Sequence, residues 1–123
     1  MEDSNDEKQE NSIESLQFGG QNCLVIGSSH IEIWHVPSQT KRNQIELPRG
    51  VSKLLVDSNN VNIVYAGCLD GVFRVIDILT GNILDEKRGH RDQILDFAIS
   101  SKSQYALTCS DDSTCKIFKL VEY

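Results

Sequence analysis

The sequence has 123 residues, of which 39% are hydrophobic and 24% are charged, a size and composition suited to about one globular domain. The net charge is −6 and no long basic run is present, which argues against binding to a nucleic-acid backbone. The acidic start lacks the apolar core of a secretory signal, and no apolar run approaches the roughly 18 residues of a membrane-spanning helix. We therefore expect a cytoplasmic protein without a transmembrane segment and without a nucleic-acid partner.

Residues 1–11 are predicted to form an acidic, disordered tail or linker. They contain five acidic residues and one lysine, and they show no hydrophobic periodicity. Ordered structure is expected to begin near Ser12.

Residues 12–47 predict a first, degenerate repeat of short strands. Period-2 alternation and turn residues place strands at 12–18, 22–27, 31–35 and 43–47. The turn at 28–30 carries no aspartate and is about two residues shorter than the corresponding later turns.

Residues 48–87 predict a second repeat, with strands at 51–56, 62–68, 72–77 and 82–87. Asp70-Gly71 is a signal for a tight hairpin between its second and third strands.

Residues 88–123 predict a third repeat with strands at 92–100, 105–110 and 114–118 and a turn at 111–113. Strict alternation would put Ile94 and Phe97 on opposite sides of the first strand, and apolar residues on both sides indicate that both faces are covered.

The third strands of the three repeats carry Trp34, Ile76 and Phe118 at intervals of 42 residues. This period, together with Gly89-His90 before the third repeat, resembles the WD40-repeat family, in which each repeat of about 40–45 residues forms a four-stranded propeller blade. The resemblance implies an all-β fold, a partial WD40 β-propeller of about three four-stranded antiparallel blades. The last blade would lack its outer strand.

The same resemblance implies a buried hydrogen-bonded tetrad in the last blade, with a phenylalanine where the family usually has tryptophan. Its members would be His90, Ser110, Asp112 and Phe118. The equivalent positions in the other two blades are Asp70, Ile76 and Trp34.

Two chemical alternatives to a structural role are a hydrolase triad and a zinc site. His90, Ser110 and Asp112 could form a hydrolase triad, but no Gly-x-Ser-x-Gly elbow is present, so a structural role is favoured. The four cysteines, at 23, 68, 109 and 115, include no Cys-x-x-Cys pair, so reduced thiols are favoured over a zinc site. We expect no catalytic residue, no metal and no cofactor.

A closer resemblance, to the angio-associated migratory cell protein family, rests on segments 11–18, 64–71, 80–81 and 89–100 and covers about residues 2–120. It implies an intracellular scaffold in cell migration and angiogenesis, and it allows peripheral membrane association. More distant relatives resemble ribosomal-protein chaperones of large-subunit assembly, which is the alternative function. Because family members carry a complete propeller, we expect a fragment or truncated form, with the remaining blades supplied by missing sequence or another chain.

In a propeller, the loops before each first strand and after each second strand gather on one face. Here these loops are 28–30, 48–50, 69–71, 88–92 and 111–113. Loops on a rigid scaffold are the usual binding positions, so we expect a protein partner there. The candidate contact residues are Arg49, Asp70, Arg91, Asp92 and Asp111, and the two arginines are the strongest of them. A chaperone would instead use the aspartates to receive a basic client.

Overall fold

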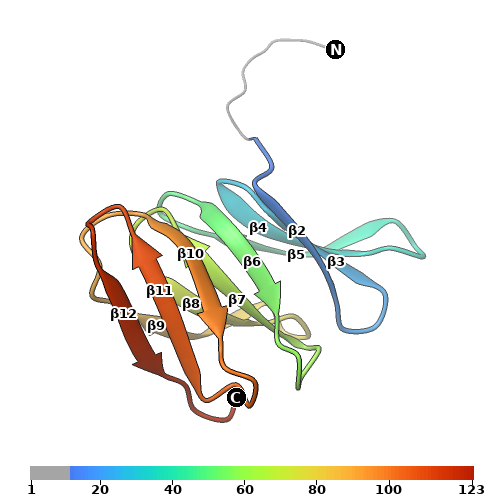
Figure 1. Cartoon of the computed structure of the whole chain (residues 1–123). Helices are drawn as coiled ribbons and strands as arrows, with labels where there is room; N and C mark the ends of the chain where they lie inside the picture. The colour runs from blue at the N-terminus through green and yellow to red at the C-terminus, as the bar shows by residue number, and fades with distance from the viewer. Residues whose placement is uncertain (1–11) are drawn as a thin grey trace.

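The computed structural model describes residues 12–123, so the predicted acidic tail at 1–11 lies outside the described residues. The described part contains β-strands and no helix, and the strands form three antiparallel sheets (Figure 1). Accordingly, residues 12–123 include no helix that could cross a membrane. The prediction of an all-β chain with three antiparallel sheets is confirmed.

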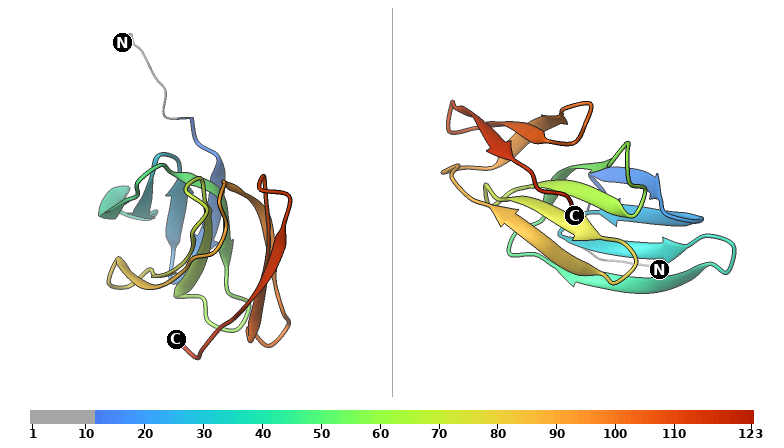
Figure 2. Two further views of the ribbon diagram at one scale, coloured as in Figure 1. Left: turned by 90° about the vertical axis from the view of Figure 1, so that its left-hand side faces the viewer. Right: turned by 90° about the horizontal axis from the view of Figure 1, so that it is seen from below.

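Each sheet is a meander whose strands pair in chain order, and we call the sheets blade 1, blade 2 and blade 3. Blade 1 consists of β2 (Ser15–Gly19), β3 (Cys23–Gly27), β4 (His30–His35) and β5 (Thr40–Glu46). Blade 2 consists of β6 (Val51–Val56), β7 (Ile63–Cys68), β8 (Phe73–Asp77) and β9 (Asn82–Lys87). Blade 3 consists of β10 (Ile94–Ile99), β11 (Tyr105–Ser110) and β12 (Cys115–Lys119). The three sheets lie side by side, with blade 2 in the middle (Figure 2).

The turn between the second and third strands is shorter in blade 1 than in blade 2. Gly27 pairs with Ile31 across this turn, whereas the corresponding pair in blade 2 is Gly67 and Phe73. The blade 1 turn is therefore two residues shorter, as the sequence predicted.

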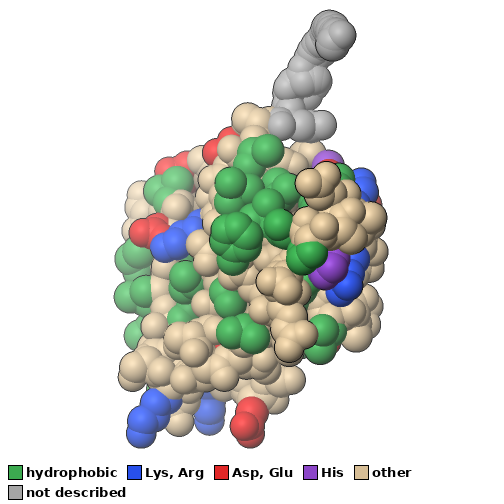
Figure 3. All heavy atoms as spheres, turned by 90° about the vertical axis from the view of Figure 1, so that its right-hand side faces the viewer, with side chains coloured by type: hydrophobic (Ala, Val, Ile, Leu, Met, Phe, Trp, Pro, Cys, Tyr) green, Lys and Arg blue, Asp and Glu red, His purple; other side chains and the backbone are tan. Residues whose placement is uncertain are grey.

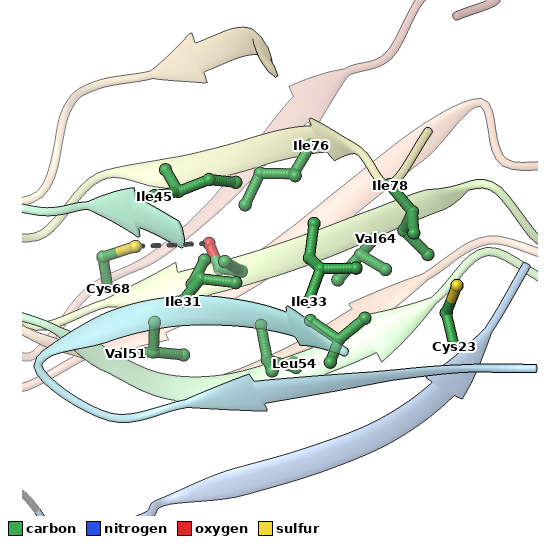
Figure 4. Packing of buried hydrophobic residues seen from close by; sticks show 12 residues of the cluster. Cys23, Ile31, Ile33, Ile45, Val51, Leu54, Val64, Cys68, Ile76 and Ile78 are labelled. Carbon is green, nitrogen blue, oxygen red and sulfur yellow. Dashed lines mark hydrogen bonds between the residues drawn. The ribbon is translucent and has the colours of Figure 1, made fainter. Parts of the chain in front are cut away.

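Blade 2 buries both of its faces, because all six residues of its strand β7 are buried. Side chains alternate along the strand, so Val64 packs toward blade 1 and Tyr65 packs toward blade 3. In the core between blades 1 and 2, Ile31 and Ile33 of β4 lie against side chains of blade 2 (Figure 4). In the core between blades 2 and 3, the Phe97 ring meets the Phe73 ring edge-on at 5.0 Å.

The expectation that Ile94 and Phe97 lie on opposite sides of β10 is wrong. A β-bulge between Ile94 and Asp96 inserts one residue, so Ile94 and Phe97 both face blade 2 and are buried. Leu95 points outward and is 52% exposed, so this strand is covered on one face within the described residues.

The outer faces of blades 1 and 3 carry exposed apolar side chains. On blade 3 these include Leu107 and Ile117, and on blade 1 they include Leu16 and Phe18 of β2. A view from the side of blade 1 shows hydrophobic side chains gathered on this face (Figure 3). The apolar packing between blades is therefore not completed at either end of the described stack.

Candidate functional site

The five loops predicted to share one face meet along a continuous edge, which is the upper edge in Figure 1. We define the loop edge as residues 28–30, 48–50, 69–71, 88–93 and 111–113. Backbone hydrogen bonds join its loops, since the Val51 amide donates to the Ser28 carbonyl at 2.8 Å and the Leu69 amide donates to the Gly50 carbonyl at 2.9 Å. The Asp111 amide donates to the carbonyl of Gln93 at 3.0 Å. The prediction that these loops lie together thus agrees with their hydrogen bonds.

Two glycines allow neighbouring loops of the edge to approach closely. Gly50 has φ 122° and Gly71 has φ 83°, both in the region that side chains disfavour. A Cβ atom on Gly71 would lie 2.7 Å from the Asp92 carbonyl oxygen, and one on Gly50 would lie 2.7 Å from the Ser28 carbonyl oxygen. The backbones of blades 1 and 2, and of blades 2 and 3, are therefore in direct contact at the loop edge.

In blade 3, a chain of hydrogen bonds connects the loop edge to the interior. Asp112 Oδ2 lies 3.1 Å from His90 Nδ1 and accepts the Arg91 amide at 2.8 Å. The other ring nitrogen of His90 lies 2.6 Å from the hydroxyl of Thr108, a fully buried residue of β11. The His90 side chain is itself 0% exposed. One carboxylate thus fixes the loop before β10 against the turn before β12.

The surroundings of Asp112 favour its charged form. Hydrogen bonds from the Thr114 hydroxyl and the Arg91 amide outweigh the effect of burial and hold the pKa of Asp112 well below its usual range. At neutral pH the carboxylate is therefore charged, and it accepts hydrogen bonds from Arg91 and Thr114 within the loop edge.

The predicted role of Ser110 as the hydroxyl partner of His90 is wrong, because Thr108 occupies that position. Ser110 Oγ donates instead to the Asp92 carbonyl at 3.0 Å and accepts the Asp112 amide at 3.1 Å. The ring of Phe118 lies edge-on to the His90 ring at 6.4 Å, where it packs without donating a hydrogen bond. Sequence spacing alone could not distinguish two hydroxyl residues that lie on the same face of β11.

In blade 2, the aspartate of the corresponding turn pairs with a buried arginine, which the sequence analysis missed. The Arg74 side chain is 2% exposed, and its Nη1 and Nη2 donate to both carboxylate oxygens of Asp70 at 3.0 and 2.8 Å. Its Nε donates to Glu86 Oε2 at 2.8 Å. The signal was present in the sequence, since a charged residue within an apolar strand requires partners. The pairing of Arg74 with Glu86 depends on the β8–β9 register, which the structure supplies.

The ion pairs of Arg74 lower the pKa values of both carboxylates, and burial raises that of a neighbouring thiol. Burial would raise the pKa of Asp70, but the hydrogen bonds and charge of Arg74 outweigh it and lower that pKa. The same guanidinium lowers the pKa of Glu86. Burial raises the pKa of Cys68 to about 11, so this thiol stays protonated.

Blade 1 has a third arrangement at the position of Trp34. The indole Nε1 donates to Glu32 Oε1 at 2.8 Å, and His30 Nε2 lies 2.6 Å from Glu32 Oε2. The hydrogen bond with His30, followed by that from Trp34, lowers the pKa of Glu32. The equivalent residue of blade 2, Ile76, makes no such contact and is buried in the core between blades 1 and 2.

The candidate contact residues divide into two groups. Arg49, Arg91, Asp92 and Asp111 are exposed on the loop edge, whereas Asp70 is engaged by Arg74. His90 is enclosed between Asp112 and Thr108, which gives it a structural role. Within residues 12–123, no group of three or more histidine, cysteine or acidic side chains could hold a metal ion. With Arg88, which is 66% exposed, the loop edge therefore presents three positive and two negative side chains on a fixed backbone.

Residues 81–119 match the family described as WD domain, G-beta repeat, and this segment includes β9 to β12. The chain is 35% identical over 120 residues to the angio-associated migratory cell proteins of Homo sapiens and Canis lupus familiaris, which covers 92% of this chain and 26% of theirs. It is 29% identical over 85 residues to THO complex subunit 6 of Drosophila melanogaster, which covers 69% of this chain and 23% of that protein. The chain thus spans about a quarter of the length of the curated relatives it matches. The crystal structure of Saccharomyces cerevisiae Sqt1 is similar with a TM-score of 0.78 over 90% of this chain and 32% of that chain, at 23% identity.

We predict that Asp112→Asn lowers the melting temperature at pH 7, because the charged acceptor of the loop edge is lost. The folded pKa of Asp112 lies below the unfolded value, so its stabilising effect is complete above about pH 5 and is lost as the pH falls toward the folded pKa. The difference between wild type and variant, followed by circular dichroism, should therefore shrink between about pH 5 and pH 2. A difference that stays constant over this range would contradict the assignment, and Asp92→Asn, at an exposed position, is the control.

We also predict that Arg74→Met lowers the free energy of unfolding by about 3 kcal/mol, because Asp70 loses its buried partner. Arg88 binds the other oxygen of Glu86 and is 66% exposed, so Arg88→Met should cost no more than about 1 kcal/mol. Urea denaturation of both variants provides the measurement. Equal losses for the two arginines would contradict the importance of the buried pair.

Proposed function

Because this chain belongs to the WD40-repeat proteins and its three sheets are blades of that fold, we propose that it is a non-enzymatic module that binds another protein through the loop edge. The observation that carries the proposal is a set of exposed charged side chains on loops that internal hydrogen bonds hold in place. These side chains are Arg49, Arg91, Asp92 and Asp111. Loops on a rigid scaffold lose little conformational entropy when they bind. Asp70 and Asp112 accept hydrogen bonds within the chain. They hold these loops in position and are not themselves the main contacts.

The charge pattern favours a partner surface of mixed charge over a uniformly basic or acidic one. Three arginines and two aspartates are exposed in neighbouring loops, so a complementary surface must carry both signs. A basic client of the ribosomal-protein type would need free carboxylates. Asp92 and Asp111 are exposed, but Asp70 and Asp112 are occupied by internal hydrogen bonds, and the arginines of the same loops repel a basic peptide. The loop edge therefore favours a partner of mixed charge over the basic client of a chaperone.

The similarity to angio-associated migratory cell proteins supports a finer proposal. We propose a cytoplasmic scaffold that takes part in cell migration and angiogenesis, as the name of those relatives indicates for them. Support for this part comes from 35% identity over 92% of the chain, and the whole-protein activity of the relatives is carried over as a proposal.

We predict that Arg91→Glu removes a defined set of proteins captured from cytosolic extract by the immobilised chain. The matched control is Lys102→Glu, which changes the charge equally at an exposed position in the loop between β10 and β11, at the opposite end of the strands. Quantitative mass spectrometry should show proteins that are lost with Arg91→Glu and retained with Lys102→Glu. Identical captured sets for wild type and both variants would contradict the proposed edge.

A further inference from the structure

Two thiols lie side by side on the outer face of blade 3. Cys109 of β11 and Cys115 of β12 are direct partners in the strand register, and their Sγ atoms are 2.9 Å apart. Cys115 is exposed and Cys109 is half-buried, whereas the other two cysteines of the chain, Cys23 and Cys68, are buried. The four thiols therefore fall into one accessible pair and two separate, shielded residues.

The register places the pair in the backbone geometry that a cross-strand disulfide needs. The Ser110 amide donates to the Thr114 carbonyl at 3.1 Å, so the next residues along the ladder, Cys109 and Cys115, form a pair without backbone hydrogen bonds between them. In such pairs the Cα atoms are about 4.5 Å apart and the side chains are closest. Disulfides join Cα atoms roughly 4.4–6.8 Å apart, so the bond can form without separating the strands.

The position of the pair also explains its accessibility. One repeat earlier, Gly67 and Phe73 occupy the equivalent places in blade 2, and both are buried beneath Ile94 and Phe97 of blade 3. The described part of the chain has no sheet beyond blade 3, so its equivalent face is open. The dithiol therefore sits where the previous repeat has a glycine and an aromatic ring closed off by the next blade.

We propose that Cys109 and Cys115 form a modification site that a small-molecule disulfide of the glutathione class oxidises to an intrachain disulfide. The Cys115 thiolate attacks one sulfur of the glutathione disulfide and releases one glutathione thiolate, leaving a mixed disulfide on Cys115. Cys109 then gives up its proton and its sulfur attacks Cys115 Sγ, which releases the second glutathione thiolate. Two cysteine thiols lose two electrons and two protons, and the glutathione disulfide gains them as two thiols.

The surroundings of Cys109 support this order of attack. The hydrogen bond with Cys115, with smaller contributions from burial and from the Asp96 carboxylate, raises the pKa of Cys109. Asp96 is its register partner on β10 and pairs with Lys53. Cys109 therefore stays protonated to a higher pH than an ordinary cysteine, and the more exposed Cys115 is the attacking thiol.

The test treats the folded full chain with glutathione disulfide and identifies the products by mass spectrometry after digestion without reduction. We expect a loss of two hydrogens from the chain, a peptide pair linked through Cys109 and Cys115, and free thiols at Cys23 and Cys68. Protection of those two buried thiols from alkylation shows in the same sample that the chain is folded. Linkage between different chains, or reaction of all four thiols at one rate, would overturn the proposal.

Single variants test the order of the two steps. Cys109→Ser should accumulate glutathione on Cys115, because the resolving thiol is absent. Cys115→Ser should react several-fold more slowly at Cys109, and equal or faster capture would overturn the assignment of the attacking thiol. The double variant, with both positions changed to serine, is the control and should take up no glutathione under these conditions.

Discussion

Blade 2 has two apolar faces, and each needs a neighbouring sheet to remove it from water. Blade 1 covers one face and blade 3 covers the other, so the middle sheet is held on both sides. Close approach between blades requires glycine at equivalent places. A Cβ atom on Gly27 would lie 3.0 Å from a methyl group of Leu54, and one on Gly67 would lie 3.0 Å from a methyl group of Ile94. This repeated packing holds the three meanders side by side, and hydrogen bonds join their loops at one edge.

Each blade pairs its polar side chains with different residues, and in blade 1 this group lies on the outer face. Blade 3 uses His90 with Asp112, blade 2 uses Arg74 with Asp70, and blade 1 uses Glu32 with its neighbouring histidine and tryptophan. In all three, a carboxylate accepts hydrogen bonds from donors that would otherwise be unpaired, and in blades 2 and 3 it also fixes the turn in which it lies. The side chains left exposed on the loop edge are then presented by a backbone that has little freedom, which suits recognition of another protein.

The regular features of the fold could be predicted from the sequence, and the particular contacts could not. The interval of 42 residues between Trp34 and Ile76 and between Ile76 and Phe118 gave the strand order, because strands of one repeat recur at one spacing. The bulge in β10 shifts the register by one residue, which alternation cannot foresee, and so Phe97 was placed on the wrong side. Thr108 was missed because two hydroxyl residues share one face of β11.

Backbone hydrogen exchange, followed strand by strand, tests most directly whether blade 2 is held from both sides. The packing predicts that the amides of β7 and β8 exchange most slowly, since their strand residues are nearly all buried. The amides of β2 and β12, whose outer faces are open, should exchange faster. Exchange in β12 as slow as in β7 would contradict this account, because the order of protection would then not follow the packing of the blades.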